Sequence, residues 1–183
     1  MLDRAGRTMS LHALDRLGIA RGDRVLEVGF GGGFLLGRLL ESEAQEVVGM
    51  DLSDAMVGRA RRRCRRELEA GRLRLLTGSA EALPRREGGF DKVCSVNTIY
   101  FWSRPAAVLS ELARVTRQGG KLALAFQLPE SVRSWPGHVH GFHAYGAEEV
   151  ARLMEDAGFQ APEITSGNDP KVGDFACLTS ERK

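Results

Sequence analysis

A cluster of glycines directly after a short apolar run constrains the fold of this chain more than any other feature. Residues 24–28 (RVLEV) are rich in valine and leucine, and residues 29–33 (GFGGG) follow without a break. Glycines let the backbone turn tightly and approach a ligand closely, and a helix start offers free N–H groups to an anionic group. The sequence therefore predicts a strand, a ligand-binding turn and a helix over residues 24–40.

Strand-like and helix-like segments alternate along the rest of the chain. Further strands are expected at residues 46–50, 72–77, 90–96, 121–127, 161–165 and 174–179. Helices are expected between Ser53 and Gly71, between Pro105 and Gly119, and from Glu148 to Gly158. This alternation predicts an α/β fold with a mostly parallel sheet, helices on both faces, and a ligand site beyond the carboxyl ends of the strands.

The length of 183 residues fits a single domain spanning residues 1–183. Within it, residues 1–23 are interpreted as an N-terminal helical segment. Residues 128–145 form the one long stretch without a clear element, which favours a functional loop.

Composition narrows the environment and the partners. A net charge of +2 requires no polyanionic partner, and no apolar run approaches the ~20 residues that span a bilayer. Three scattered cysteines and an N-terminus without an apolar leader predict a cytoplasmic protein. The sequence leaves the oligomeric state open.

The spacing of the glycines separates two classes of nucleotide-binding protein. The dinucleotide pattern G-x-G-x-x-G would require glycine at position 34, where the chain has Phe34. It would also not require an acid at the strand end, where Glu27 lies. The spacing therefore argues against an NAD-dependent oxidoreductase.

A carboxylate at the end of the second predicted strand is the next candidate. Asp51 lies in the segment VVGMDLS, where it could accept two hydrogen bonds from a ribose diol. The alternative is an acid that stabilises the start of the helix after Ser53, and Asp51 could serve both purposes. Its position downstream of the glycine cluster favours the ribose interpretation.

Together these motifs resemble the first motifs of class I S-adenosylmethionine-dependent methyltransferases, and the resemblance extends from about residue 24 to residue 159. Four later segments resemble successive motifs of the ubiquinone/menaquinone-biosynthesis-like, small-molecule branch: LLTGSAEALP (75–84), FDKVCSVNTIYFW (90–102), LSELARVTRQGGKL (109–122) and YGAEEVARLMEDAGF (145–159).

The resemblance implies a Rossmann-like, seven-stranded sheet with an antiparallel last strand, S-adenosylmethionine as cofactor, and methyl transfer to an O, N or C nucleophile of a small molecule. It implies the following cofactor contacts: Glu27 and Gly29 near the methionine end, with Gly31 and Gly33 in the same turn; Asp51 at the ribose; Leu52, Ser79 and Ala80 at the adenine; Asn97 at the sulfonium. Many relatives carry Asp where this chain has Ser79, so the adenine amino contact is weaker here or moves to Glu81.

The motifs say less about the residues that bind the methyl acceptor, and no catalytic residue is assigned. One ring among residues 100–102 is expected to line the acceptor pocket while the others pack, with Tyr100 as a candidate. His138, His140 and His143 lack the four ligands of a closed zinc site, so no metal is predicted. We expect them, with Tyr145, on a lid over the acceptor, where one histidine could act as a base; the alternative is a solvent-facing crossover.

Two other functions share the same fold. One is an RNA methyltransferase, but residues 1–23 contain no recognisable RNA-binding module. The run of arginines over residues 59–66 lacks aromatic residues for base stacking, which favours a solvated helix face over a nucleic-acid surface. The other is a protein that binds the methyl donor without transferring the methyl group.

Overall fold

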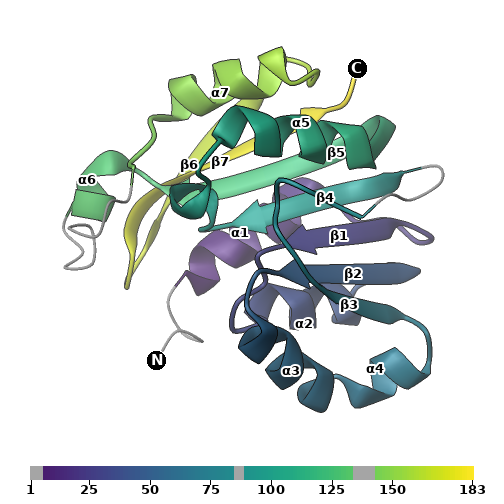
Figure 1. Ribbon diagram of the computed structural model, residues 1–183. Helices are drawn as coiled ribbons and strands as arrows, with labels where there is room; N and C mark the ends of the chain where they lie inside the picture. Colours follow the sequence, from purple (N-terminus) through teal and green to yellow (C-terminus); the bar gives the residue numbers. More distant parts are fainter. Residues whose placement is uncertain (1–5, 85–88, 134–142) are drawn as a thin grey trace.

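Residues 6–84, 89–133 and 143–183 are described by this computed structural model and form a seven-stranded sheet with helices on both faces (Figure 1). The strands are β1 (Arg24–Val28), β2 (Glu46–Asp51), β3 (Leu73–Thr77), β4 (Phe90–Val96), β5 (Thr116–Gln127), β6 (Glu163–Asp169) and β7 (Gly173–Glu181). The helices are α1 (Arg7–Leu17), α2 (Phe34–Glu41), α3 (Asp54–Arg63), α4 (Arg65–Glu69), η2 (Ile99–Phe101), α5 (Pro105–Val115), α6 (Pro129–Arg133) and α7 (Ala147–Asp156).

The strand order β3-β2-β1-β4-β5-β7-β6 confirms the expected fold. Strands β1 to β5 run parallel to one another, whereas β7 is antiparallel to both β5 and β6. The order reverses at β1 and β4, and in open α/β sheets ligands bind beyond the carboxyl ends of the strands at such a point. The candidate site therefore lies beyond the ends of β1, β2 and β4.

Each face of the sheet has its own apolar core. Helices α5 and α7 pack on one face through residues such as Leu109 and Met154, both fully buried. Helices α2 and α3 cover the other face through Leu36 and Val57, and α1 lies beside them on that face (Figure 1). Helical spacing of apolar residues predicted these buried faces, because such residues line one side of a helix.

The helix expected between Ser53 and Gly71 is interrupted at Cys64. Cys64 leaves helical geometry with φ −107° and ψ 39°, so α3 and α4 are separate helices. The break keeps the Cys64 side chain in the same core as α3 while α4 turns to contact β3. The prediction of one continuous helix was wrong, because the chain departs from helical geometry at the buried Cys64.

The start of β5 is a second correction. Helix α5 ends at Val115 rather than at Gly119, and β5 begins at once with Thr116, whose hydroxyl donates to the Leu112 carbonyl (2.7 Å). The glycines lie inside the strand, at a shift of register against β4 between Phe90 and Lys92. They mark this irregularity and not a helix stop.

The stretch at 128–145 also differs from its prediction as a segment without an element. Helix α6 occupies residues 129–133, directly after β5, and Leu128 donates its backbone N–H to Asp174 at the start of β7 (2.9 Å). His138 and His140 lie outside the described residues.

Candidate functional site

The glycine turn, defined here as residues 29–33, connects β1 to α2 at the carboxyl edge of the sheet. Gly29 adopts a φ of 77°, and a Cβ atom there would collide with the Thr98 methyl group, so only glycine fits. Its N–H donates to the carbonyl of Met50 at the end of β2 (2.7 Å). The turn is thereby fixed against both neighbouring strands.

Asp51 connects this turn to the start of α3. Its Oδ2 atom accepts a hydrogen bond from the Gly31 N–H (2.7 Å), and its Oδ1 atom accepts one from the Ser53 N–H (2.9 Å). The carboxylate therefore supports the start of α3, as the alternative interpretation held, and also organises the turn. Each oxygen keeps a second lone pair that could accept from a ligand hydroxyl.

Glu27 is a buried carboxyl group at the same place. It lies on β1 between Gly49 of β2 and Cys94 of β4, and only 3% of it is exposed. Its Oε2 atom has no hydrogen-bond partner among the described residues. Burial first, and then the charge of Asp51, raises the pKa of Glu27 to about 8. A buried carboxyl oxygen without a donor is costly, so this position suits a cationic ligand group.

The ends of β4 and β5 are joined by side chains. Asn97 adopts a φ of 62°, and its Oδ1 atom accepts from Nε2 of Gln127 (3.0 Å). The Ser95 hydroxyl donates to the Val28 carbonyl (2.7 Å) and pairs with the Thr98 hydroxyl (2.5 Å). These contacts join the end of β4 to β1 and β5 at the carboxyl edge, where Asn97 lies.

The three aromatic residues after β4 have different environments. The Tyr100 hydroxyl accepts a hydrogen bond from the backbone N–H of Gln127, and burial raises the pKa of Tyr100 above its ordinary value. Trp102 packs in the core at 8% exposure, whereas the Phe101 side chain is 68% exposed. Phe101 is therefore the most exposed ring of the three, and the hydroxyl of Tyr100 is already hydrogen-bonded.

The residues expected at an adenine base lie beyond β2 and β3. Leu52 is 76% exposed, which leaves an apolar side chain in solvent beside Asp51. The Glu81 carboxylate accepts from Arg104 (2.6 Å) and from the Ser103 hydroxyl (2.9 Å), and the Arg104 hydrogen bond first of all lowers its pKa. Glu81 is thus paired within the chain, and Ser79 bonds the Glu81 N–H (3.2 Å).

His143 and Tyr145 lie at the far end of the 128–145 stretch. The His143 Nε2 atom is 4.0 Å from a carboxylate oxygen of Glu149, and its ring contacts the Tyr145 ring at a centroid distance of 4.4 Å. Tyr145 packs into the core, and burial raises its pKa. Within the described ranges no three His, Cys, Asp or Glu residues are arranged to hold a metal ion, and no helix is long and apolar enough to cross a membrane.

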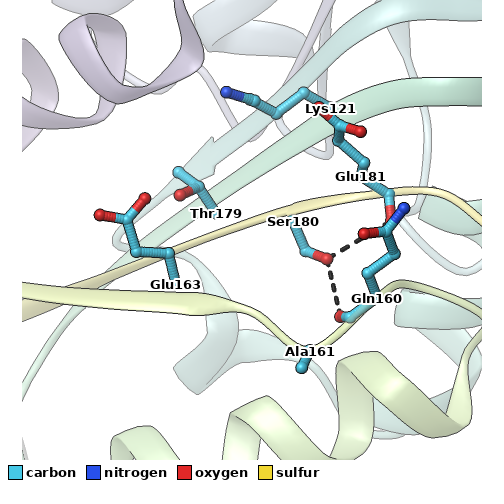
Figure 2. A pocket seen from close by; sticks show the side chains of 7 residues that line it. All are labelled: Lys121, Gln160, Ala161, Glu163, Thr179, Ser180 and Glu181. Atoms are coloured by element: carbon cyan, nitrogen blue, oxygen red, sulfur yellow. Dashed lines mark hydrogen bonds between the residues drawn. The ribbon is translucent and has the colours of Figure 1, made fainter.

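Figure 2 shows a polar hollow on a different part of the sheet. Its side chains come from β5, β6, β7 and the segment before β6: Lys121, Gln160, Ala161, Glu163, Thr179, Ser180 and Glu181. Lys121 lies in the amino-terminal half of β5, opposite Glu181. None of the candidate residues lines this hollow, and it is therefore separate from the carboxyl edge.

Arg63 is a site residue that the sequence interpretation missed. Its Nη1 atom donates to the Gly32 carbonyl (2.9 Å) and its Nη2 atom to the Gly33 carbonyl (2.7 Å). Arg63 belongs to the arginine run that was assigned to a solvated helix face. No local pattern distinguishes it from its neighbours, because the contact depends on where α3 passes α2.

Comparison with known proteins gives a consistent result. Residues 26–124 match the family model described as "Methyltransferase domain". A protein named "Uncharacterized methyltransferase YdaC" from Bacillus subtilis is 33% identical over 178 residues, covering 96% of this chain and 92% of the relative. "Erythromycin 3''-O-methyltransferase" from Saccharopolyspora erythraea is 28% identical over 92% of this chain, which spans only 60% of the relative's length.

A solved structure supports the same assignment. The S-adenosylmethionine-dependent methyltransferase from Aquifex aeolicus superposes with a TM-score of 0.76 at 25% identity, covering 100% of this chain and 95% of that one. The similarity thus includes β6, β7 and α1, which lie outside the family match.

Proposed function

We propose, from the premise that this chain belongs to the methyltransferase-domain family, that it methylates an oxygen, nitrogen or carbon nucleophile of a small molecule. The family makes the protein an S-adenosylmethionine-dependent methyltransferase; the class of acceptor is our proposal. The observation that most supports methyl-donor binding at this edge is the buried, unpartnered Glu27 oxygen beside the glycine turn and Asp51. The named activity of the Saccharopolyspora relative agrees with an O-nucleophile.

The described residues fit the cofactor at the carboxyl edge. S-adenosylmethionine supplies a methyl group that is already activated by a cationic sulfur. We assign Glu27 to the amino group of its methionine part, because an ammonium would pair the orphan carboxyl oxygen. We assign the glycine turn to its carboxylate, because Gly33 precedes α2 without a side-chain cap and the start of the helix so offers backbone N–H groups.

The remaining cofactor assignments follow the order of the strands. Asp51 keeps acceptor capacity for a ribose diol. Leu52, with its exposed side chain, covers one face of the adenine, and Ser79, Ala80 and Glu81 lie at its edge. Asn97 flanks the reacting sulfur beyond β4.

The acceptor enters from the side of β4 and β5. We assign Phe101 to the acceptor wall in place of Tyr100, because its ring is exposed while the Tyr100 hydroxyl is bound to β5. The stretch at 128–145 follows β5 at the same edge, and we propose that it closes over the acceptor and supplies the base. Placement of acceptor and cofactor is the main task of the chain, with proton removal as an accessory. We also propose that residues 1–183 act as one domain, in the small-molecule branch that the motifs resemble.

A methyl-transfer screen tests this proposal. The protein is incubated with S-adenosylmethionine carrying a radiolabelled methyl group, against separate panels of metabolites and of RNA, with Asp51→Ala as the negative control. Label on a metabolite supports the proposal. Label on RNA alone would replace it with the RNA methyltransferase. Tight cofactor binding by calorimetry with no transfer to either panel would favour a binding protein of the same fold.

A further inference from the structure

The guanidinium of Arg63 spans two consecutive carbonyls of the glycine turn. It donates to Gly32 at 2.9 Å and to Gly33 at 2.7 Å from the last position of α3, thirty residues along the chain. A trans peptide holds its C=O and its N–H in opposite directions. The Gly33 carbonyl also accepts from the Gly37 N–H (3.1 Å), so Arg63 and the first turn of α2 together fix the Phe34 N–H in the other direction, out of the start of α2.

The contact between Arg63 and the glycine turn requires glycine at position 33. Gly33 has a φ of 75°, and a Cβ atom placed on it would overlap the Nη2 atom of Arg63. The space that a side chain at position 33 would need is thus filled by the guanidinium. The Gly33 N–H donates to the Phe30 carbonyl (2.7 Å), while the Gly32 carbonyl accepts from Arg63. Both polar groups of the peptide between Gly32 and Gly33 are therefore hydrogen-bonded.

Arg63 also acts on the charge of Glu27. The charged or titratable groups that influence Glu27 are Asp51 on β2, Arg63 on α3 and the buried thiol of Cys94 on β4. Burial and Asp51 raise the pKa of Glu27, and Arg63 is the group that opposes them. The guanidinium therefore favours the ionised form of Glu27, which is the form that binds an ammonium group.

We propose that Arg63 is a positioning residue of the cofactor site, which holds the glycine turn in its binding geometry through the Gly32 and Gly33 carbonyls. This role rests on the proposed placement of the cofactor at Glu27 and the glycine turn. Arg63 acts through the turn and through Glu27 and does not touch the reacting atoms.

Three variants separate its geometric role from its charge. Arg63→Gln removes both the paired donors and the charge, and Arg63→Lys keeps the charge but loses the planar fork. Arg62→Gln is the matched control, since Arg62 lies in the same last turn of α3. Binding of S-adenosylmethionine is measured by calorimetry from pH 6 to pH 9. Thermal unfolding of each variant without ligand is measured alongside.

We expect Arg63→Gln to weaken binding about tenfold at pH 8, Arg63→Lys to weaken it less, and Arg62→Gln to match the parent protein. In Arg63→Gln the pH at which binding improves should move upward, because Glu27 loses its cation, while Arg63→Lys keeps the parent midpoint. In a Glu27→Gln background that shift should vanish.

Equal binding by Arg63→Gln and the parent protein overturns the proposal, as does equal loss in Arg63→Gln and Arg62→Gln. A loss of affinity in Arg63→Gln with an unmoved midpoint and a lowered Tm would reduce Arg63 to a stabilising surface residue, which also overturns it. If the parent protein itself does not bind S-adenosylmethionine, the proposed placement of the cofactor fails first. The two failures are therefore distinguishable.

Discussion

The two halves of the carboxyl edge are built in different ways. Beyond β1 and β2, backbone N–H groups are bound to a half-buried carboxylate, as in the bond from the Gly31 N–H to Asp51 (2.7 Å). Beyond β4 and β5, the edge presents the exposed ring of Phe101, and His143 stands at the end of the stretch that follows β5. We call these the cofactor side and the acceptor side.

The difference matches what each side is proposed to bind. A cofactor of constant structure can be recognised by backbone groups in fixed positions, which tolerate little change in sequence. An acceptor is selected by side chains, which can vary while the fold stays the same. We therefore expect substitutions on the cofactor side to alter cofactor affinity, and substitutions on the acceptor side to leave it intact.

The largest effect should follow Asp51→Ala. The variant loses the hydrogen bonds proposed to the ribose and the support of the Gly31 N–H, so cofactor affinity should fall about 100-fold. Asp54→Ala is the control, because Asp54 lies in the first turn of α3 and has no bond to the glycine turn among the described residues. Calorimetry that finds equal affinity in Asp51→Ala and the parent protein would remove the ribose assignment.

Replacement of the histidines at the acceptor side should lower turnover. We expect at least one of His138→Ala, His140→Ala and His143→Ala to lower turnover about 100-fold with cofactor affinity unchanged, because a general base contributes at least that much. Turnover is measured with an acceptor found in the methyl-transfer screen, and His12→Ala serves as control. Full activity in all three variants would mean that these histidines only face solvent.

A smaller effect concerns the pH dependence of Glu27. Its pKa of about 8, against 4.5 for an ordinary glutamate, means that folded Glu27 retains a proton which the unfolded chain releases. The free energy of unfolding should therefore fall as the pH rises from 4.5 toward 8, and Glu27→Gln should abolish this contribution.

Cofactor binding should show the opposite trend. As the pH rises toward the pKa of Glu27, cofactor affinity should improve by up to about tenfold per pH unit, because only the carboxylate pairs with an ammonium. Calorimetry in buffers of different ionisation enthalpy should detect the proton released on binding. Glu27→Gln should bind weakly with a flat pH profile, and a sloping profile in that variant would assign the proton to another group.

The smallest effect should follow Phe101→Ala. Loss of an exposed ring should raise the KM for the acceptor about tenfold while cofactor affinity and Tm stay within error. Leu11→Ala is the matched control, since Leu11 is also an exposed apolar residue, on α1. A change in cofactor affinity instead would place Phe101 on the cofactor side and weaken the distinction between the two sides.

Much of the fold was predictable because the relevant patterns are local. Alternation of strands and helices, the glycine cluster and Asp51 at the end of a strand are properties of short segments, and the structure confirms the sheet they predict. The same local reasoning failed at Cys64, where a helix was predicted to continue, and at Gly119, where a helix was predicted to end. There, packing against β3 and pairing with β4 decided the outcome.

The sequence by itself determined which residues gather at the carboxyl edge, since the ends of parallel strands must meet there. Only the tertiary structure decided which of them contact one another. Arg63 reaches Gly33 because α2 and α3 contribute to the same core on one face of the sheet, and Tyr100 is bound to Gln127 because β4 and β5 are neighbours. These partners are far apart in the chain, and residue type and spacing within a segment carry no information about such contacts.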